Sequence, residues 1–273
     1  MRFQRIRPVP PLRDFVEGIW FFETSGPLER DDMKLVVPNG RPLLVMPFRN
    51  GIVARMKGQE YRSETDTIAV VGACSHPSIV DSVTDGPAGT IGVEISPAGA
   101  YRFFRLSLKE LKDQSTSLAD ILGRTGRELE RRLSGLKNVE EKVGALQQFL
   151  VTLSAQRETD RVFEHCVRAI EAARGGLRIR QLEQETGYSS RWLNRKFEER
   201  LGISPKNFSS IVRFQHYYQA MLANRVEFFR ERRFYLHYHD ESHFIKEFKR
   251  FTGFSPAQLI RSKNQFGSMF YQE

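Results

Sequence analysis

The sequence predicts an α+β protein of two domains, a β-rich N-terminal domain followed by helices and then an all-α C-terminal domain. Up to Ser96, short β-favouring runs alternate with turn residues, whereas the later chain repeats apolar side chains at helical spacing. Residues 161–273 carry 20 Lys and Arg against 12 Asp and Glu, a net charge of +8 out of +9 for the whole chain. We place the boundary between 1–157 and 158–273, in a polar stretch without periodicity.

Composition indicates a folded protein of the cytoplasm. The apolar fraction of 40% is ordinary for a globular chain, so disorder is not expected. The N-terminus lacks the apolar run of a signal peptide, and no uncharged stretch approaches the ~18 residues of a membrane span. The two cysteines, Cys74 and Cys166, have no paired spacing. We therefore expect reduced thiols and no membrane association.

The N-terminal part contains seven β-favouring runs. They are residues 18–25, 34–38, 42–48, 51–57, 66–73, 78–83 and 89–96. So many short strands at such spacing favour a sandwich or barrel over a parallel sheet. Asn50-Gly51 lies between two apolar runs and predicts a β-hairpin there.

Two amphipathic stretches, 117–136 and 138–156, complete this domain. The second places apolar residues at alternating steps of four and three, namely Val139, Val143, Leu146, Leu150 and Leu153. This seam spans only about two heptads. It favours a helix that packs on its own domain, and a dimerising helix pair is the alternative.

The basic C-terminal part contains an internal repeat. Segments 189–205 and 240–256 both contain a Phe, then a Gly, then Ser-Pro, at an offset of 51 residues. Each is a capped helix that follows a shorter helical stretch and a turn, which predicts two helix-turn-helix motifs. The second helix of such a motif presents a polar face to the DNA major groove.

The outward positions of these two helices supply the candidate DNA-binding residues. They are Arg191, Asn194 and Arg195 on the first helix and Ser242 and Lys246 on the second. Arg and Asn have the side chains that read base edges bidentately, whereas Ser and Lys position a protein on phosphates. Glu198 and Lys249 also lie on the outward faces.

The doubled arrangement resembles the AraC/XylS family of bacterial transcription regulators from about residue 160 to 263. The resemblance is carried by "GYSSRWLNRKF", "LGISPKNF" and above all "DESHFIKEFKRFTGFSPAQLIR". The N-terminal "PVPPLRDFVEGIWFFE" and "VVPNGRPLLVMPF" resemble an uncharacterised regulatory domain often found ahead of this module. Family members use a separate N-terminal domain to sense a small molecule or to dimerise, often as a cupin-like β-barrel.

The resemblance implies double-stranded DNA and an unknown small-molecule effector as partners, with RNA polymerase and a second copy of the chain as further ones. By carry-over, Arg191, Asn194 and Arg195 fall where the family reads bases. The matching positions of the second motif are Glu241, Ser242 and Lys246.

The chain departs from the family where the helices of each motif cross. Arg233 and His237 occupy the places of a small residue and a glycine in the second motif, and Glu183 replaces a small residue in the first. Tyr217 is bulkier than usual on the linking helix, while Gly187 is retained. We therefore expect the first motif to read bases and the second to contact the DNA phosphate backbone without reading the sequence. The alternative is a ligand-binding or adaptor protein whose DNA-binding module has degenerated.

No catalytic, cofactor or metal site is predicted. His239 and His243 are four residues apart but flank the start of a helix, so they need not share a face. Cys74 and His76 could form a nucleophile and base, but a buried cysteine at a strand end is the favoured interpretation. The sequence has no Gly-rich phosphate loop and no paired-carboxylate motif, so an enzyme is not expected.

Overall fold

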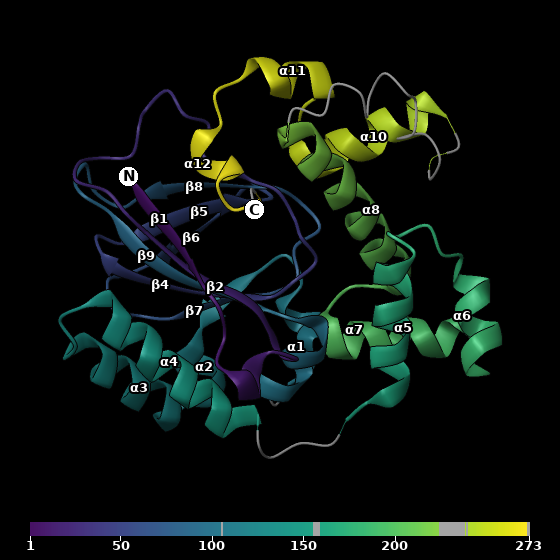
Figure 1. The fold of residues 1–273 in the computed structure, drawn as a ribbon, viewed down its shortest axis with the longest axis horizontal. Helices are drawn as coiled ribbons and strands as arrows, with labels where there is room; N and C mark the ends of the chain where they lie inside the picture. Colours follow the sequence, from purple (N-terminus) through teal and green to yellow (C-terminus); the bar gives the residue numbers. More distant parts are fainter. Residues whose placement is uncertain (105, 155–158, 224–237, 239, 272–273) are drawn as a thin grey trace.

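The computed structural model describes residues 1–104, 106–154, 159–223, 238 and 240–271 (Figure 1). Its N-terminal domain has two antiparallel sheets, one with the strand order β1-β2-β9-β4-β7-β10 and one with the order β3-β8-β5-β6. The strands are β1 (Arg2–Ile6), β2 (Val16–Glu23), β3 (Leu35–Val36), β4 (Leu43–Arg49), β5 (Ile52–Met56), β6 (Gln59–Ser63), β7 (Ala69–Val71), β8 (Ser78–Ser82), β9 (Gly89–Ile95) and β10 (Ser115–Ser117). Each of the seven predicted runs overlaps one of these strands.

The predicted hairpin at Asn50-Gly51 is wrong. Strand β4 pairs with β7 and β9, whereas β5 pairs with β6 and β8, so this turn carries the chain from one sheet to the other. The Asn50 side chain stabilises this turn between the sheets. Its amide group donates to the Thr84 carbonyl at 2.7 Å, and its oxygen accepts from the Thr84 amide at 3.2 Å. The hairpin of this region lies instead at Lys57-Gly58, where both residues have positive φ (52° and 77°), as a type I′ turn requires.

Helices cover the outer face of the six-stranded sheet, where α2 (Leu118–Leu122), α3 (Arg124–Ser134) and α4 (Val139–Ser154) lie together (Figure 1). Strand β2 alternates between the two faces of its sheet. Ile19 and Phe21 join the core under the helices, whereas Trp20 and Phe22 join a second apolar cluster on the inner face.

The heptad seam of α4 packs within its own domain, which confirms the favoured interpretation. Its first four members are at most 9% exposed: Val139, Val143, Leu146 and Leu150. Leu153 is partly buried against the same core. A second copy of the chain therefore has no access to this seam.

The C-terminal domain is helical. Its elements are α5 (Arg161–Ala172), α6 (Ile179–Thr186), α7 (Ser190–Leu201), α8 (Pro205–Leu222), α10 (Glu241–Thr252), α11 (Pro256–Arg261) and α12 (Gln265–Ser268). The long α8 runs between α7 at one end and α10 at the other (Figure 1). Among the described residues, no helix has the length and apolar content needed to span a membrane.

The two domains share one continuous apolar core. Gly202, in the left-handed conformation at φ +89° after α7, lies against the carbonyl of Leu108, and a Cβ there would be 2.5 Å from that oxygen. The Gln215 amide donates to the Pro38 carbonyl at 2.6 Å, and the Arg41 guanidinium pairs with Glu171 at 3.0 Å. The N-terminal domain therefore touches both the start and the middle of the helical domain.

Candidate nucleic-acid interface and internal cavity

The first helix-turn-helix consists of α6, a turn at Gly187 and α7. Gly187 ends α6 in the left-handed conformation (φ +74°), which costs glycine little. Ser189 then caps α7 by accepting a hydrogen bond from the Trp192 amide at 3.4 Å. Leu193 and Phe197 are buried and fix the inner face of the helix.

Glu183, which stands where the family has a small residue, fits into this turn. Its carboxylate accepts a hydrogen bond from the Ser190 amide at 2.5 Å, so it satisfies a free N–H at the start of α7. A negative charge is also favourable at that position of a helix. Glu183 therefore stabilises the first motif, and this removes one reason for considering the module degenerate.

Replacing Glu183 with alanine is expected to lower the free energy of unfolding by about 1 kcal/mol, because the cap of α7 is lost. Urea denaturation of the full chain measures this change. The neighbouring, exposed Gln184→Ala is the matched control and should shift stability by less than about 0.5 kcal/mol. Equal effects of the two substitutions would show that the Glu183 contact contributes nothing.

The predicted residues of the first motif lie along one edge of α7. Arg191 and Arg195 are exposed, and Asn194 between them is partly buried. Arg195 is 3.8 Å from Glu199, with 70% of its side chain exposed, so its guanidinium is accessible to a partner. Glu198 instead pairs with Lys109 of the N-terminal domain at 3.4 Å.

An aromatic pair beside these residues was missed from the sequence. The rings of Tyr188 and Trp192 stack at 3.9 Å between centroids, and Lys196 lies 5.0 Å over the Trp192 ring. Tyr188 is 40% exposed although it is aromatic. Tyr188 precedes the Ser189 cap and lies outside α7, so helical spacing gave no signal for this contact.

The second motif presents its helix α10 in the same way. Asp240 caps it by accepting from the His243 amide at 2.7 Å, which confirms the predicted cap. Ser242 and Lys246 are exposed, as predicted for outward positions. The inner face buries the aromatic residues Phe244, Phe248 and Phe251. Arg233, His237 and His239, on which the predicted distortion and the histidine cluster depend, lie outside the described residues.

A buried ion pair joins α10 to α8. Arg213 of α8 donates from Nε and Nη2 to the Glu247 carboxylate at 2.8–3.1 Å, and the two side chains are only 13% and 8% exposed. The guanidinium also lies 4.7 Å over the Tyr238 ring and donates to the Gly175 carbonyl at 3.3 Å. This bidentate pair fixes the second reading helix relative to the linking helix.

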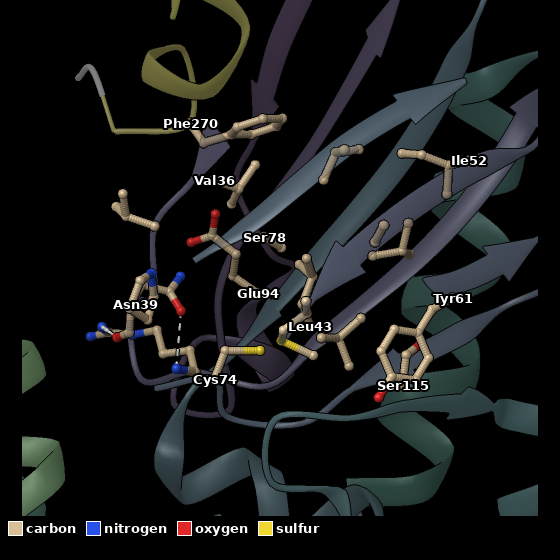
Figure 2. Close-up of a pocket in the computed structure, with 18 of the residues that line it drawn as sticks. Val36, Asn39, Leu43, Ile52, Tyr61, Cys74, Ser78, Glu94, Ser115 and Phe270 are labelled. Carbon is tan, nitrogen blue, oxygen red and sulfur yellow. Dashed lines mark hydrogen bonds between the residues drawn. The ribbon is translucent and has the colours of Figure 1, made fainter. Parts of the chain in front are cut away.

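A cavity of about 140 Å³ lies between the two sheets of the N-terminal domain, with Phe270 from the C-terminal end of the chain also in its lining (Figure 2). Most of its lining is aliphatic or aromatic, including Val36, Leu43, Ile52 and Met56. Polar groups are few, and Glu94 of β9 projects into the space. A concave apolar site with few polar groups is typical of small-molecule binding.

Cys74 lines this cavity, but its surroundings do not activate it. Burial, with a smaller effect of Asp113, raises the pKa of the Cys74 thiol to about 12, so the neutral thiol prevails at pH 7. The thiol points to the Gly72 carbonyl at 3.3 Å, while His76 Nδ1 lies 3.3 Å from Asp113. The structure therefore favours a half-buried, protonated cysteine near a strand end over a nucleophile–base pair. In the described part of the chain, no three His, Cys, Asp or Glu side chains gather as metal ligands.

Comparison with known families assigns both parts of the chain. Residues 182–262 match the family described as "Helix-turn-helix domain", and residues 4–117 match "Domain of unknown function (DUF6597)". The first match spans α7, α8 and α10 with their caps. Residues 182–262 therefore form an AraC-type helix-turn-helix domain. No curated protein matches the sequence.

Three solved structures are similar to this chain at low sequence identity. An apo form of a ToxT variant from Vibrio cholerae strain SCE256 has a TM-score of 0.50 at 12% identity, covering 89% of this chain and 98% of that chain. Another structure of ToxT from Vibrio cholerae has a TM-score of 0.49 at 10% identity, covering 95% and 98%. ToxT from strain SCE256 bound to an unsaturated fatty acid has a TM-score of 0.47 at 12% identity, covering 89% and 95%. At these identities the first likeness shows a common fold.

Proposed function

We propose that this protein is a sequence-specific DNA-binding transcription regulator whose DNA binding is controlled by a small molecule in the N-terminal cavity. The observation that carries the proposal is the pair of equally built helices α7 and α10. Each begins at a side-chain cap, ends at a left-handed glycine, and exposes polar or basic side chains beside a buried apolar face.

In this proposal, Arg191, Asn194 and Arg195 read bases, and Ser242 and Lys246 position the second helix. The long α8 separates the two reading helices, so they would enter major-groove segments about one helical turn (~34 Å) apart. The net charge of +8 on residues 161–273 supports attraction to the phosphate backbone.

Residues 1–157 form the effector domain and 158–273 the DNA-binding domain. The cavity supports this division, because most of its lining residues belong to the first part, with Phe266, Phe270 and Tyr271 of the second part completing it. We place the regulator in the cytoplasm, where DNA and effector meet, and assign it no catalytic step. RNA polymerase and a second copy of the chain are further partners within this proposal, and the α4 seam is excluded as the dimer surface.

A mobility-shift titration at increasing salt tests the proposal. The full chain should form a complex with fragments from its own regulatory regions that survives moderate salt and an excess of unrelated DNA. Non-specific phosphate binding weakens steeply with salt. A steep loss of binding with no preference among fragments would reject sequence-specific recognition.

A further inference from the structure

The cavity contains one carboxylate that the protein only partly satisfies. Glu94 Oε1 accepts a hydrogen bond from the Trp20 indole N–H at 3.1 Å. Among the described residues, no hydrogen bond reaches its second oxygen. Figure 2 shows the carboxylate near the end of the cavity formed by Val36 and Phe270. An apolar space with a carboxylate at one end selects a ligand with a matching donor.

The positive groups near the cavity already have partners in the protein. Arg41 pairs with Glu171 at 3.0 Å and lies 3.3 Å from Glu17, although its buried Nε makes no hydrogen bond among the described residues. Arg5 donates to the Phe270 carbonyl. A ligand carboxylate would have to compete with these partners and would also approach Glu94. A cationic ligand meets neither obstacle and has to overcome only the repulsion from Arg5 and Arg41, whose charges also act on Glu94.

We propose that the cavity binds a small molecule with an apolar body and a protonated amino group, and that this amino group pairs with Glu94. The proposal rests on the effector role proposed above for the cavity. Burial raises the pKa of Glu94, against the opposing charges of Arg5 and Arg41, so the carboxylate holds its negative charge at a cost. A bound ammonium group removes that cost by direct pairing. The volume suits a body of about one aromatic ring, as in a cavity of similar size that takes up benzene.

Three probes of one shape test this class by calorimetry with the full chain and no DNA. They are 2-phenylethylamine, 2-phenylethanol and 3-phenylpropanoate. The amine should bind at least about tenfold more tightly than the carboxylate, because its ammonium group gains a charged hydrogen bond with Glu94 in a desolvated site. Tighter binding of the carboxylate, or no binding of the amine, would overturn the proposal.

The variant Glu94→Gln should lower the affinity for the amine about tenfold. Its affinity for 2-phenylethanol should stay within about threefold of wild type, which also shows that the cavity is intact. Glu60→Gln, an exposed acid on β6 of the same domain, is the matched control and should change neither affinity. An unchanged amine affinity in Glu94→Gln would reject Glu94 as the partner. If the amine binds but no specific DNA complex forms, the regulator proposal fails and the ligand class stands.

A second inference concerns the C-terminal tail, residues 263–271. This tail leaves the helical domain after α11 and returns to the N-terminal domain (Figure 1). Asn264 forms two hydrogen bonds with the backbone of Leu35, at 2.8 and 2.9 Å. The Phe266 amide donates to Asp32 at 3.0 Å, and a Cβ on Gly267 would overlap the Leu35 carbonyl oxygen. The tail is thus fitted closely to the β3 region.

The same tail closes the cavity. Phe266 and Phe270 line it and are 4% and 9% exposed. Phe270 packs on Trp20 at 4.7 Å between ring centroids, and Phe266 packs on Phe22 at 5.1 Å. A molecule in the cavity would therefore touch the segment that directly follows the second helix-turn-helix.

The geometry points to the tail as an attachment of the second reading helix α10 to the effector domain, with only α11 between them. It acts beside the route through α8, where Arg213 holds Glu247 and Gln215 holds Pro38. The first reading helix is held separately, through Gly202 against Leu108 and Lys109 with Glu198. A ligand that displaces Phe266 or Phe270 would then move α10 relative to α7 and so change the spacing of the two reading helices.

Amide hydrogen exchange of the full chain, without ligand or DNA, tests the attachment. Asn264→Ala removes both bonds to Leu35 and should accelerate exchange in α10 and α11 by about tenfold, with α7 unchanged. The exposed neighbour Gln265→Ala is the control and should leave all three helices unchanged. Unaltered exchange in α10 and α11 of Asn264→Ala, or equal acceleration in α7, would overturn this role of the tail.

Discussion

Replacing Arg195 with alanine is expected to weaken binding to the specific DNA site by ~1–3 kcal/mol, which is about 5- to 150-fold. Arg195 projects from the exposed edge of α7, and only Glu199, 3.8 Å away, pairs with it among the described residues. A bidentate arginine contact to a guanine edge carries discrimination of this size. The loss should therefore concentrate at one base position and flatten the preference there.

Competition binding with single-base variants of the site measures both effects. Arg131→Ala is the matched control, because it removes an equal charge from an exposed position of α3 in the other domain. It should leave base preference unchanged. If Arg195→Ala binds with wild-type affinity and selectivity, Arg195 does not read DNA.

Replacing Arg213 with methionine is expected to lower the free energy of unfolding by about 3–5 kcal/mol. The substitution leaves the Glu247 carboxylate, 8% exposed, without its partner in the interior. An unpaired buried charge costs far more than the pair contributes. The contact between α8 and α10 should loosen first, and with it the second reading helix.

A double-mutant cycle with Glu247→Leu separates pairing from packing. The double variant removes both charges and should recover most of the lost stability, because no unpaired charge remains. Chemical denaturation of the four proteins gives the coupling energy. Additive losses in the double variant would show that Arg213 and Glu247 contribute independently.

The helical reading units could be predicted because their signals are local. The repeated Gly-x-Ser-Pro has one structural meaning in both copies. Gly202 and Gly253 end the reading helices at φ +89° and +81°, and the serines that follow cap α8 and α11. Glycine in the left-handed region and Ser-Pro at a helix start are constrained by backbone chemistry alone.

The cavity and its closure could not be predicted, because they depend on contacts between distant parts of the chain. Asn264 meets Leu35 across 229 residues, and neither belongs to a motif. The error at Asn50-Gly51 has a related cause, since a turn signal does not specify which sheet the next strand joins. The sequence comparison showed only that Glu183 is larger than the usual residue at its position. Its hydrogen bond to the Ser190 amide, which stabilises the start of α7, appears only in the structure.

A genomic footprint of the tagged full-length protein tests the central claim most directly. A sequence-specific regulator with two reading helices predicts discrete protected sites that share a sequence. Each site should have two protected major-groove segments about one helical turn apart (~10 base pairs). Protection spread over DNA without a common sequence, or no protection at all, would contradict the claim that this chain reads DNA.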